Sequence, residues 1–247
     1  MAFSAVHDLF IDERELRVSS NGTGRPILML HDLGSSAASW EAMTPEVVAA
    51  GREVVAIDLP GSGHSDAVAD NRLTGFVEHL HAALDHLVEF AGDPIDVVGH
   101  GFGGYLGLSL AAWFPDRISG LVVEDPMLPP RSGPPVRARM SPTMAVSGAL
   151  TTVRRGRFRE NVHGFARAKA VLDQLAQADP AWWAGLARIT APTFIIGTGL
   201  AHAGDRALLD LLAASIEPAT RTDLPGARRG HLSDADAFAA MVVGFLG

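Results

Sequence analysis

The side chains of this chain that can act as acids, bases or nucleophiles are histidines, carboxylates and hydroxyls, because the sequence contains no cysteine. Cysteine catalysis, thiolate metal sites and disulfides are therefore excluded. Histidine suits proton transfer at neutral pH, since its unperturbed pKa is about 6.5, so the ten histidines are candidate bases. His202 and His231 have no metal-ligand spacing with nearby carboxylates, and the glycine-rich segment 99–104 lacks the G-K-[ST] signature of a phosphate loop. We therefore expect no metal and no cofactor.

Hydroxyl groups are the remaining candidate nucleophiles. Nothing in the sequence places a loop serine beside His231 on an activating turn. We expect four of them to be hydrogen-bonding loop residues instead: Ser35, Ser36, Ser62 and Ser65.

Apolar runs alternate along the chain with segments of helical periodicity. The strands and helices that these segments predict must position the candidate side chains. Continuous apolar runs predict strands buried on both faces, as in a parallel sheet covered by helices. These runs are 26–30, 53–57, 95–98, 120–123 and 193–196. Helical periodicity marks 73–90, 105–114, 208–216 and 235–246. The alternation predicts an α/β fold with a doubly wound, mostly parallel sheet.

One segment breaks this alternation. It opens with five prolines between positions 126 and 135 and then becomes arginine-rich and helical. An insertion at this point would overhang the carboxyl edge of the sheet, where ligands of open α/β folds bind. We therefore predict a core of residues 1–125 and 187–247 with a helical cap at 126–186.

The segment from Val97 to Gly104 (VVGHGFGG) resembles the strand–elbow–helix of α/β hydrolases, whose motif is G-x-S-x-G. Gly99, Gly103 and Gly104 match the pattern, whereas Gly101 stands where the family carries its attacking serine. Acyl-enzyme chemistry needs an oxygen or sulfur nucleophile beside a base. That route is closed at position 101.

Other blocks carry the same resemblance. Residues 28–34 (LMLHDLG) resemble the H-G-x-G oxyanion loop, with Asp32 in place of the usual glycine. The resemblance implies that the amides of Leu33 and Phe102 form an oxyanion hole. Residues 58–66 and 114–125 resemble two further blocks of the family, and 224–231 (LPGARRGH) resembles the late loop that carries the catalytic histidine, here His231.

The acid that would orient His231 is less well marked. The family usually places it after the strand at 193–196, but Leu200 occupies that position here and Asp205 lies a few residues beyond. Some members, including dehalogenases and cofactor-free dioxygenases, place the acid after the preceding strand, where Asp125 stands. We predict Asp125, with Asp205 as the alternative.

Three functions follow from the resemblance. The first is an enzyme without a serine nucleophile, in which His231 acts as general acid and base. Its substrate would be a small carbonyl metabolite, as in natural-product biosynthesis. The reaction would be direct attack by water, cyclisation, isomerisation, elimination or C–C cleavage. The second is a ligand-binding protein that has lost catalysis. The third is a serine esterase inactivated by a Ser-to-Gly substitution. The candidate substrate-binding residues are Asp32, His100, Trp182 and Trp183. Asp32 would bind a substrate hydroxyl, and the alternative role of His100 is packing beside the elbow. One of the two tryptophans would line the pocket while the other packs on the core.

Charge and hydropathy limit the classes of partner that this protein is expected to bind. The net charge of −8 argues against nucleic-acid and anionic-membrane binding. No apolar run approaches the roughly 20 residues needed to span a bilayer, and residues 1–20 do not resemble a signal peptide, so we expect a cytoplasmic protein. Arginines in the predicted cap suit an anionic ligand or an acidic carrier protein, among them Arg131, Arg137, Arg139, Arg154, Arg155, Arg157 and Arg159.

Overall fold

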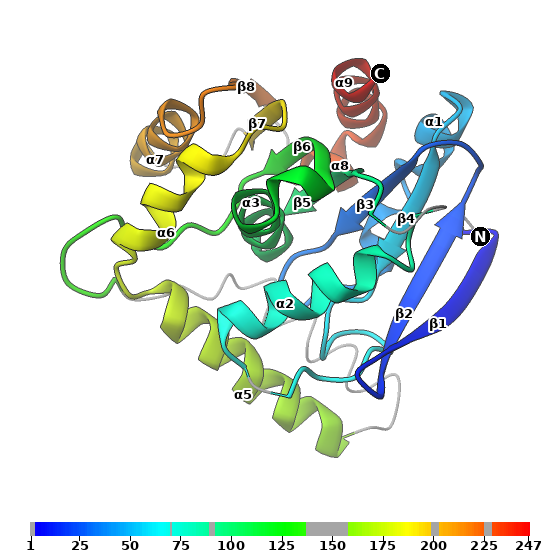
Figure 1. Cartoon of the computed structure of the whole chain (residues 1–247), viewed down its shortest axis with the longest axis horizontal. Helices are drawn as coiled ribbons and strands as arrows, with labels where there is room; N and C mark the ends of the chain where they lie inside the picture. The colour runs from blue at the N-terminus through cyan, green and yellow to red at the C-terminus, as the bar shows by residue number, and fades with distance from the viewer. Residues whose placement is uncertain (1–2, 70, 89–91, 137–157, 199–202, 225–228) are drawn as a thin grey trace.

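One mixed sheet forms the centre of the fold (Figure 1). The structure is a computed structural model that describes residues 3–69, 71–88, 92–136, 158–198, 203–224 and 229–247. Within these residues the sheet has eight strands in the order β1-β2-β4-β3-β5-β6-β7-β8. The pairs β1–β2 and β2–β4 are antiparallel, and the remaining pairs are parallel. Their bounds are β1 Ala5–Ile11, β2 Arg14–Asn21, β3 Pro26–Leu30, β4 Glu53–Ile57, β5 Ile95–His100, β6 Ile118–Glu124, β7 Thr193–Thr198 and β8 Ala219–Leu224.

The strands predicted from apolar runs form the centre of this sheet. β3 and β4 have the predicted bounds, while β5, β6 and β7 extend one or two residues beyond them. The edge strands β1 and β8 were not predicted, because their residues are largely exposed or half-buried and carry no continuous apolar run. The doubly wound, mostly parallel α/β architecture is confirmed.

Helices cover both faces of the sheet. Successive residues of a strand point to opposite faces, and neighbouring residues such as Ile27 and Leu28 enter two separate apolar clusters. One cluster includes α1 (Thr44–Ala49) and α9 (Ala235–Leu246). The other includes α2 (Leu73–Leu84), α3 (Phe102–Trp113) and α7 (Ala203–Ala214). The site lies between these two layers, at the carboxyl ends of the central strands.

Three helices differ from the sequence prediction in their bounds. α2 ends at Leu84 rather than residue 90, and α3 begins at Phe102 rather than Tyr105. α7 begins at Ala203, five residues before its predicted start. α9 has its predicted bounds.

The predicted cap segment contributes α5 (Phe158–Leu175) and α6 (Pro180–Gly185). Figure 1 shows α5 beside α2. Gln174 Nε2 donates to the carbonyl of Asn71 at 2.7 Å, and Arg167 Nη1 donates to the carbonyl of Gly61 at 3.0 Å. These contacts attach α5 to the loop that follows β4, and the division at residues 126 and 186 stays a prediction. In the described part of the chain, no helix is long and apolar enough to cross a membrane.

Candidate active site

The turn between β5 and α3 has the geometry of a nucleophile elbow but carries no side chain. Gly101 has φ 57° and ψ −115°, a left-handed conformation that favours glycine. Its N–H donates to the carbonyl of Glu124 at 3.0 Å, and its own carbonyl accepts from the N–H of Met127 at 2.9 Å. A Cβ at Gly99 would lie 2.5 Å from the carbonyl oxygen of Gly103. The close approach of strand and helix therefore requires the flanking glycine.

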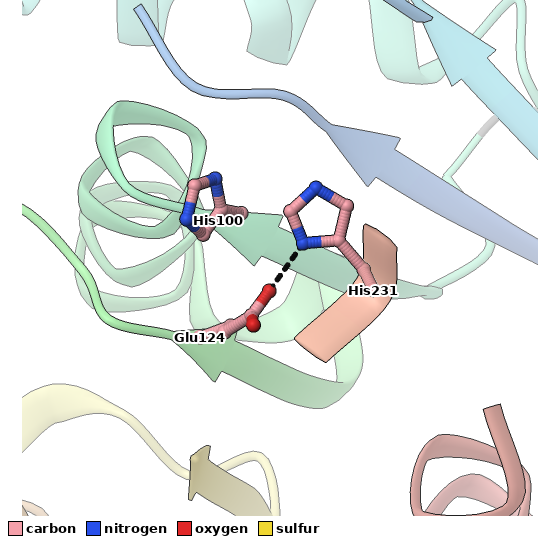
Figure 2. A group of neighbouring side chains, drawn as sticks. All are labelled: His100, Glu124 and His231. Carbon is pink, nitrogen blue, oxygen red and sulfur yellow. Dashed lines mark hydrogen bonds and ion pairs between the residues drawn. The ribbon is translucent and has the colours of Figure 1, made fainter. Parts of the chain in front are cut away.

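His231 pairs with Glu124 across the end of the sheet (Figure 2). His231 lies on α8 (Gly230–Ser233), and its Nδ1 is 2.5 Å from Oε2 of Glu124 at the end of β6. The other carboxylate oxygen accepts from the N–H of Gly230. Both side chains are buried, and the rings of Trp40 and His100 lie 4.6 Å from the imidazole. The pair is thus shielded from solvent, with two aromatic side chains beside the imidazole.

Burial sets the protonation of this pair. Burial raises the pKa of Glu124 to about 7, an effect that His100 opposes. Burial and the charge of Arg229 lower the pKa of His231 to about 3. The imidazole is therefore neutral at physiological pH, and Nδ1–H donates to Glu124 when that side chain is ionised. This leaves the lone pair of Nε2 to accept a proton from water or substrate.

The structure corrects the predicted partner of His231. Asp125 is bound to Thr198 instead, whose N–H donates to Oδ1 at 3.0 Å and whose hydroxyl donates to Oδ2. Asp205 lies in the first turn of α7 and is exposed. Asp125 follows the last residue of β6 with a φ of 40°, and its carboxylate is held by Thr198 rather than by His231. The signal in the sequence that could have identified Glu124 is its position as a carboxylate at the last residue of a buried apolar strand.

Asp32 occupies the place that an attacking side chain would take. Its Oδ1 accepts the N–H of Leu33 at 2.8 Å and the N–H of Phe102 at 2.9 Å. A Cβ at Gly101 would overlap Oδ1 and lie 3.0 Å from Oδ2. The two amides predicted as an oxyanion hole therefore do converge, but onto the carboxylate of Asp32 rather than onto open space.

His31 fixes the loop that carries Asp32. It is fully buried, and burial lowers its pKa. Its Nε2 accepts the N–H of Leu59 at 2.9 Å, so Nδ1 carries the proton and donates to the carbonyl of Asp32 at 2.7 Å. This neutral imidazole joins the ends of β3 and β4 and holds Asp32 over the elbow.

The two tryptophans lie in the core rather than beside His231. Trp182 is stacked on Tyr105, and its Nε1 donates to the hydroxyl of Ser109 at 2.8 Å. The Nε1 of Trp183 donates to the carbonyl of Pro129 at 2.8 Å. Both indole N–H groups are thus bound within the protein, and a role in lining a pocket stays a prediction.

Part of the predicted site lies outside the described residues. This applies to Leu200 and to Arg137, Arg139, Arg154, Arg155 and Arg157, while for Arg159 only the backbone is described. Arg131 is exposed. The anionic ligand and the acidic carrier protein therefore stay predictions.

His100, Glu124 and His231 also form a cluster of metal-ligand type within the described residues. One ligand atom from each lies within 4.8 Å of the others, and all three side chains are buried. However, Nδ1 of His231 and both oxygens of Glu124 already bind one another or Gly230. The contacts present therefore fit a hydrogen-bonded catalytic pair.

Sequence comparison places this geometry in a family. Residues 27–241 match the profile of the alpha/beta hydrolase family. The chain belongs to the alpha/beta hydrolase family. It is 37% identical over 109 residues to a 2-hydroxymuconate semialdehyde hydrolase of Pseudomonas sp. (strain CF600), and the aligned region covers 42% of this chain and 37% of that protein. It is 33% identical over 130 residues to a haloalkane dehalogenase of Psychrobacter cryohalolentis, which covers 50% of this chain and 43% of that protein.

A structural neighbour supports the same fold over the whole chain. A hydrolase from Pseudomonas aeruginosa PA01 superposes with a TM-score of 0.73 at 22% identity and covers 99% of both chains. The two sequence relatives above match over less than half of their own lengths. Family membership therefore fixes the fold and the coarse class, an enzyme-rich hydrolase superfamily, and leaves the reaction to be argued from the site.

Proposed function

We propose that this protein is an enzyme that acts on a small organic molecule by general acid–base catalysis at His231, with no attacking side chain at position 101. The observation that carries this proposal is the 2.5 Å contact between Nδ1 of His231 and the buried carboxylate of Glu124. A carboxylate in this position fixes the tautomer of the imidazole and stabilises the imidazolium that forms during proton transfer. His231 would take a proton from water and return it to the leaving group.

Hydrolysis by activated water is the reaction that the relatives favour, because they are named as hydrolases and a dehalogenase. Cyclisation, isomerisation, elimination and C–C cleavage use the same base and belong to the wider class. The carbonyl substrate expected from the sequence would need the amides of Leu33 and Phe102, and Asp32 occupies both. A carbonyl oxygen held in that hole is therefore not part of the proposal.

The inactivated-esterase hypothesis receives no support from the site. A serine at position 101 would place its Cβ on Oδ1 of Asp32. The Asp32 side chain fills the space beside Gly101 in this structure, and a serine at position 101 would require that side chain to move.

The test compares wild-type protein with His231→Ala and Glu124→Gln on a library of small alkyl halides, esters, lactones and β-diketones, with products identified by mass spectrometry. We expect wild-type protein to convert at least one class. Loss of the general base should lower that rate about 10²–10⁴-fold.

The matched control is His7→Ala, since His7 is an exposed histidine on the edge strand β1. It should keep the wild-type rate. If His231→Ala also keeps the wild-type rate, the proposed function is wrong.

A further inference from the structure

Positions 32 and 101 both depart from the motifs that the chain resembles, and the two departures are complementary in space. The loop after β3 carries an aspartate where the resembling motif has glycine, and the elbow carries glycine where the motif has its nucleophile. The carboxylate of Asp32 fills the volume that opens above Gly101, with Oδ1 and Cγ overlapping the place of a Cβ. A functional group therefore still stands at the elbow, but it comes from the neighbouring loop.

The two oxygens of this carboxylate have different environments. Oδ1 accepts both amide hydrogens, from Leu33 at 2.8 Å and from Phe102 at 2.9 Å. Among the described residues no hydrogen bond to Oδ2 is seen, and the residue is partly exposed. Oδ2 is the oxygen with free lone pairs. The carboxylate lies at the place of a Cβ on Gly101, which directly follows His100, and the ring centroids of His100 and His231 are 4.6 Å apart. Asp32 and the two imidazoles therefore belong to the same end of the sheet.

We propose that Asp32 is the nucleophile of this enzyme: its Oδ2 attacks a saturated carbon that carries a leaving group, and an alkyl ester forms on the Asp32 side chain. The proposal rests on the proposed function for its second step, in which His231 activates water. It assigns a catalytic role to a residue outside the elbow.

The occupied hole determines the substrate class. Attack on an acyl carbon would create an oxyanion on the substrate, and that oxyanion would need the amides of Leu33 and Phe102. Both amides are bound to Asp32. Displacement at a saturated carbon creates no such oxyanion, and a halide leaves as a stable anion without a proton. The geometry therefore fits a small primary alkyl halide.

The first step balances without a further reactant. A lone pair of Oδ2 forms the new C–O bond, the carbon–halogen bond breaks, and the halide leaves with the bonding electrons. The product is a neutral alkyl ester of Asp32, whose carbonyl oxygen is Oδ1 between the two amides.

The second step uses the hole and the His231–Glu124 pair together. Water attacks Cγ of Asp32 as Nε2 of His231 takes its proton, and the negative charge develops on Oδ1, where two N–H groups already point. The tetrahedral intermediate then breaks down by cleavage of the bond between Cγ and the alkylated oxygen, and the departing alcohol takes the proton back from His231. The carboxylic acid then loses one proton to solvent, so alkyl halide and water give alcohol, halide and a proton.

The first experiment traps the ester. His231→Ala protein is incubated with 1-bromobutane, digested, and examined by peptide mass spectrometry. Without the base the ester should accumulate, and the butyl group should lie on the peptide that contains Asp32. An adduct on another residue, or no adduct and no turnover by wild-type protein across a series of alkyl bromides, overturns the proposal.

The second experiment follows oxygen. Wild-type protein turns over 1-bromobutane in water enriched in the heavy oxygen isotope. A nucleophilic carboxylate gives its own oxygen to the alcohol and takes the water oxygen, so the isotope should appear in Asp32, and the first alcohol formed should lack it. Isotope in the alcohol from the first turnover and none in Asp32 means that water attacks the substrate directly, and the proposal is then wrong.

The third experiment uses variants. Asp32→Asn should lose roughly a thousandfold or more of the rate. The matched control Asp93→Asn should lose none, because Asp93 is exposed and precedes β5, at the opposite edge of the sheet. The double variant Asp32→Gly with Gly101→Asp should regain part of the activity, since it returns the carboxylate to the elbow, whereas a purely structural role of Asp32 predicts no regain.

These outcomes separate the two proposals. If Asp32→Asn keeps its rate and His231→Ala is inactive, Asp32 is not the nucleophile and the proposed function stands. If the butyl ester forms on Asp32 but His231→Ala still hydrolyses it at the wild-type rate, the nucleophile stands and the proposed role of His231 is wrong.

Discussion

Glu124 is completely buried, so hydrogen-bond donors from the protein must take the place of water around its carboxylate. Those donors are Nδ1 of His231 and the N–H of Gly230. Its neighbour Asp125 is bound to Thr198. Two adjacent carboxylates thus serve different partners, and the assignment can be tested one residue at a time.

Glu124→Gln should lower the catalytic rate roughly a hundredfold to ten-thousandfold, because an amide does not stabilise the imidazolium and can favour the wrong tautomer. Asp125→Asn should lower it only a few-fold, since that side chain does not reach His231. Steady-state kinetics on any converted substrate measures both effects. Equal losses in the two variants would contradict the pairing of Glu124 with His231.

Gly101→Ser should fail to create an esterase, because the new Cβ would overlap the carboxylate of Asp32. The positive φ adds strain, so the variant should lose about 1–3 kcal/mol of unfolding free energy. Denaturant unfolding and labelling by a fluorophosphonate probe measure the two effects.

The double variant Gly101→Ser with Asp32→Gly supplies the contrast. It clears the carboxylate and frees the amides of Leu33 and Phe102 beside His231. This variant should react with the probe. Strong labelling of the single variant at wild-type stability would show that Asp32 does not block the elbow.

At the scale of elements, a buried ion pair ties the beginnings of two strands to the end of α9. Arg52 Nη2 lies 2.5 Å from Oδ2 of Asp96, and both side chains are buried. Arg52 Nη1 also donates to the carbonyl of Gly247 at 2.9 Å. A cation at the end of a helix is favoured by the helix dipole. This network lies at the opposite edge of the sheet from His231, where it serves stability.

Asp96→Ala should lower the free energy of unfolding by about 3–5 kcal/mol, because it leaves the Arg52 guanidinium buried without its partner. Ser119→Ala removes one hydrogen bond to the same carboxylate, at 2.6 Å, and should cost only about 1 kcal/mol. Chemical denaturation of the three proteins measures both differences. A loss for Asp96→Ala no larger than that for Ser119→Ala would show that the pair is unimportant.

At the scale of the whole molecule, the buried imidazole links stability to pH. Burial lowers the pKa of His231 from 6.5 to about 3, so the folded protein binds fewer protons than the unfolded chain between these values. Stability therefore rises with pH through this window, and it is lost as pH falls. The raised pKa of Glu124 has the opposite sign between 4.5 and about 7, so the net curve of wild-type protein is flatter than His231 alone would give.

The difference between Glu124→Gln and the double variant Glu124→Gln with His231→Gln isolates the imidazole, because the carboxyl group that contacts it is absent from both proteins. Glu124→Gln should lose stability relative to the double variant as pH falls from about 6.5 toward 3. Unfolding curves at a series of pH values give this difference. A difference that does not change with pH would mean that the imidazole is not kept neutral by burial.

The sequence by itself determined the central sheet and the elbow. Residues 26–30 and 53–57 are apolar without interruption, because strands covered on both faces have no polar side. The glycine at 99 was equally readable, since its contact with the backbone of Gly103 leaves no room for a Cβ. The edge strands β1 and β8 escaped prediction because their exposed faces impose no such pattern.

Tertiary structure alone decided which acid serves His231 and what fills the elbow. Glu124 and Asp125 are neighbours in sequence, and only the direction of each side chain at the end of β6 separates their roles. Asp32 and Gly101 lie 69 positions apart. Their complementary departures from the motifs become visible only where β3 and β5 pair and bring the two loops together. Spacing along a chain carries no information about such contacts, because they depend on packing between segments that the sequence keeps apart.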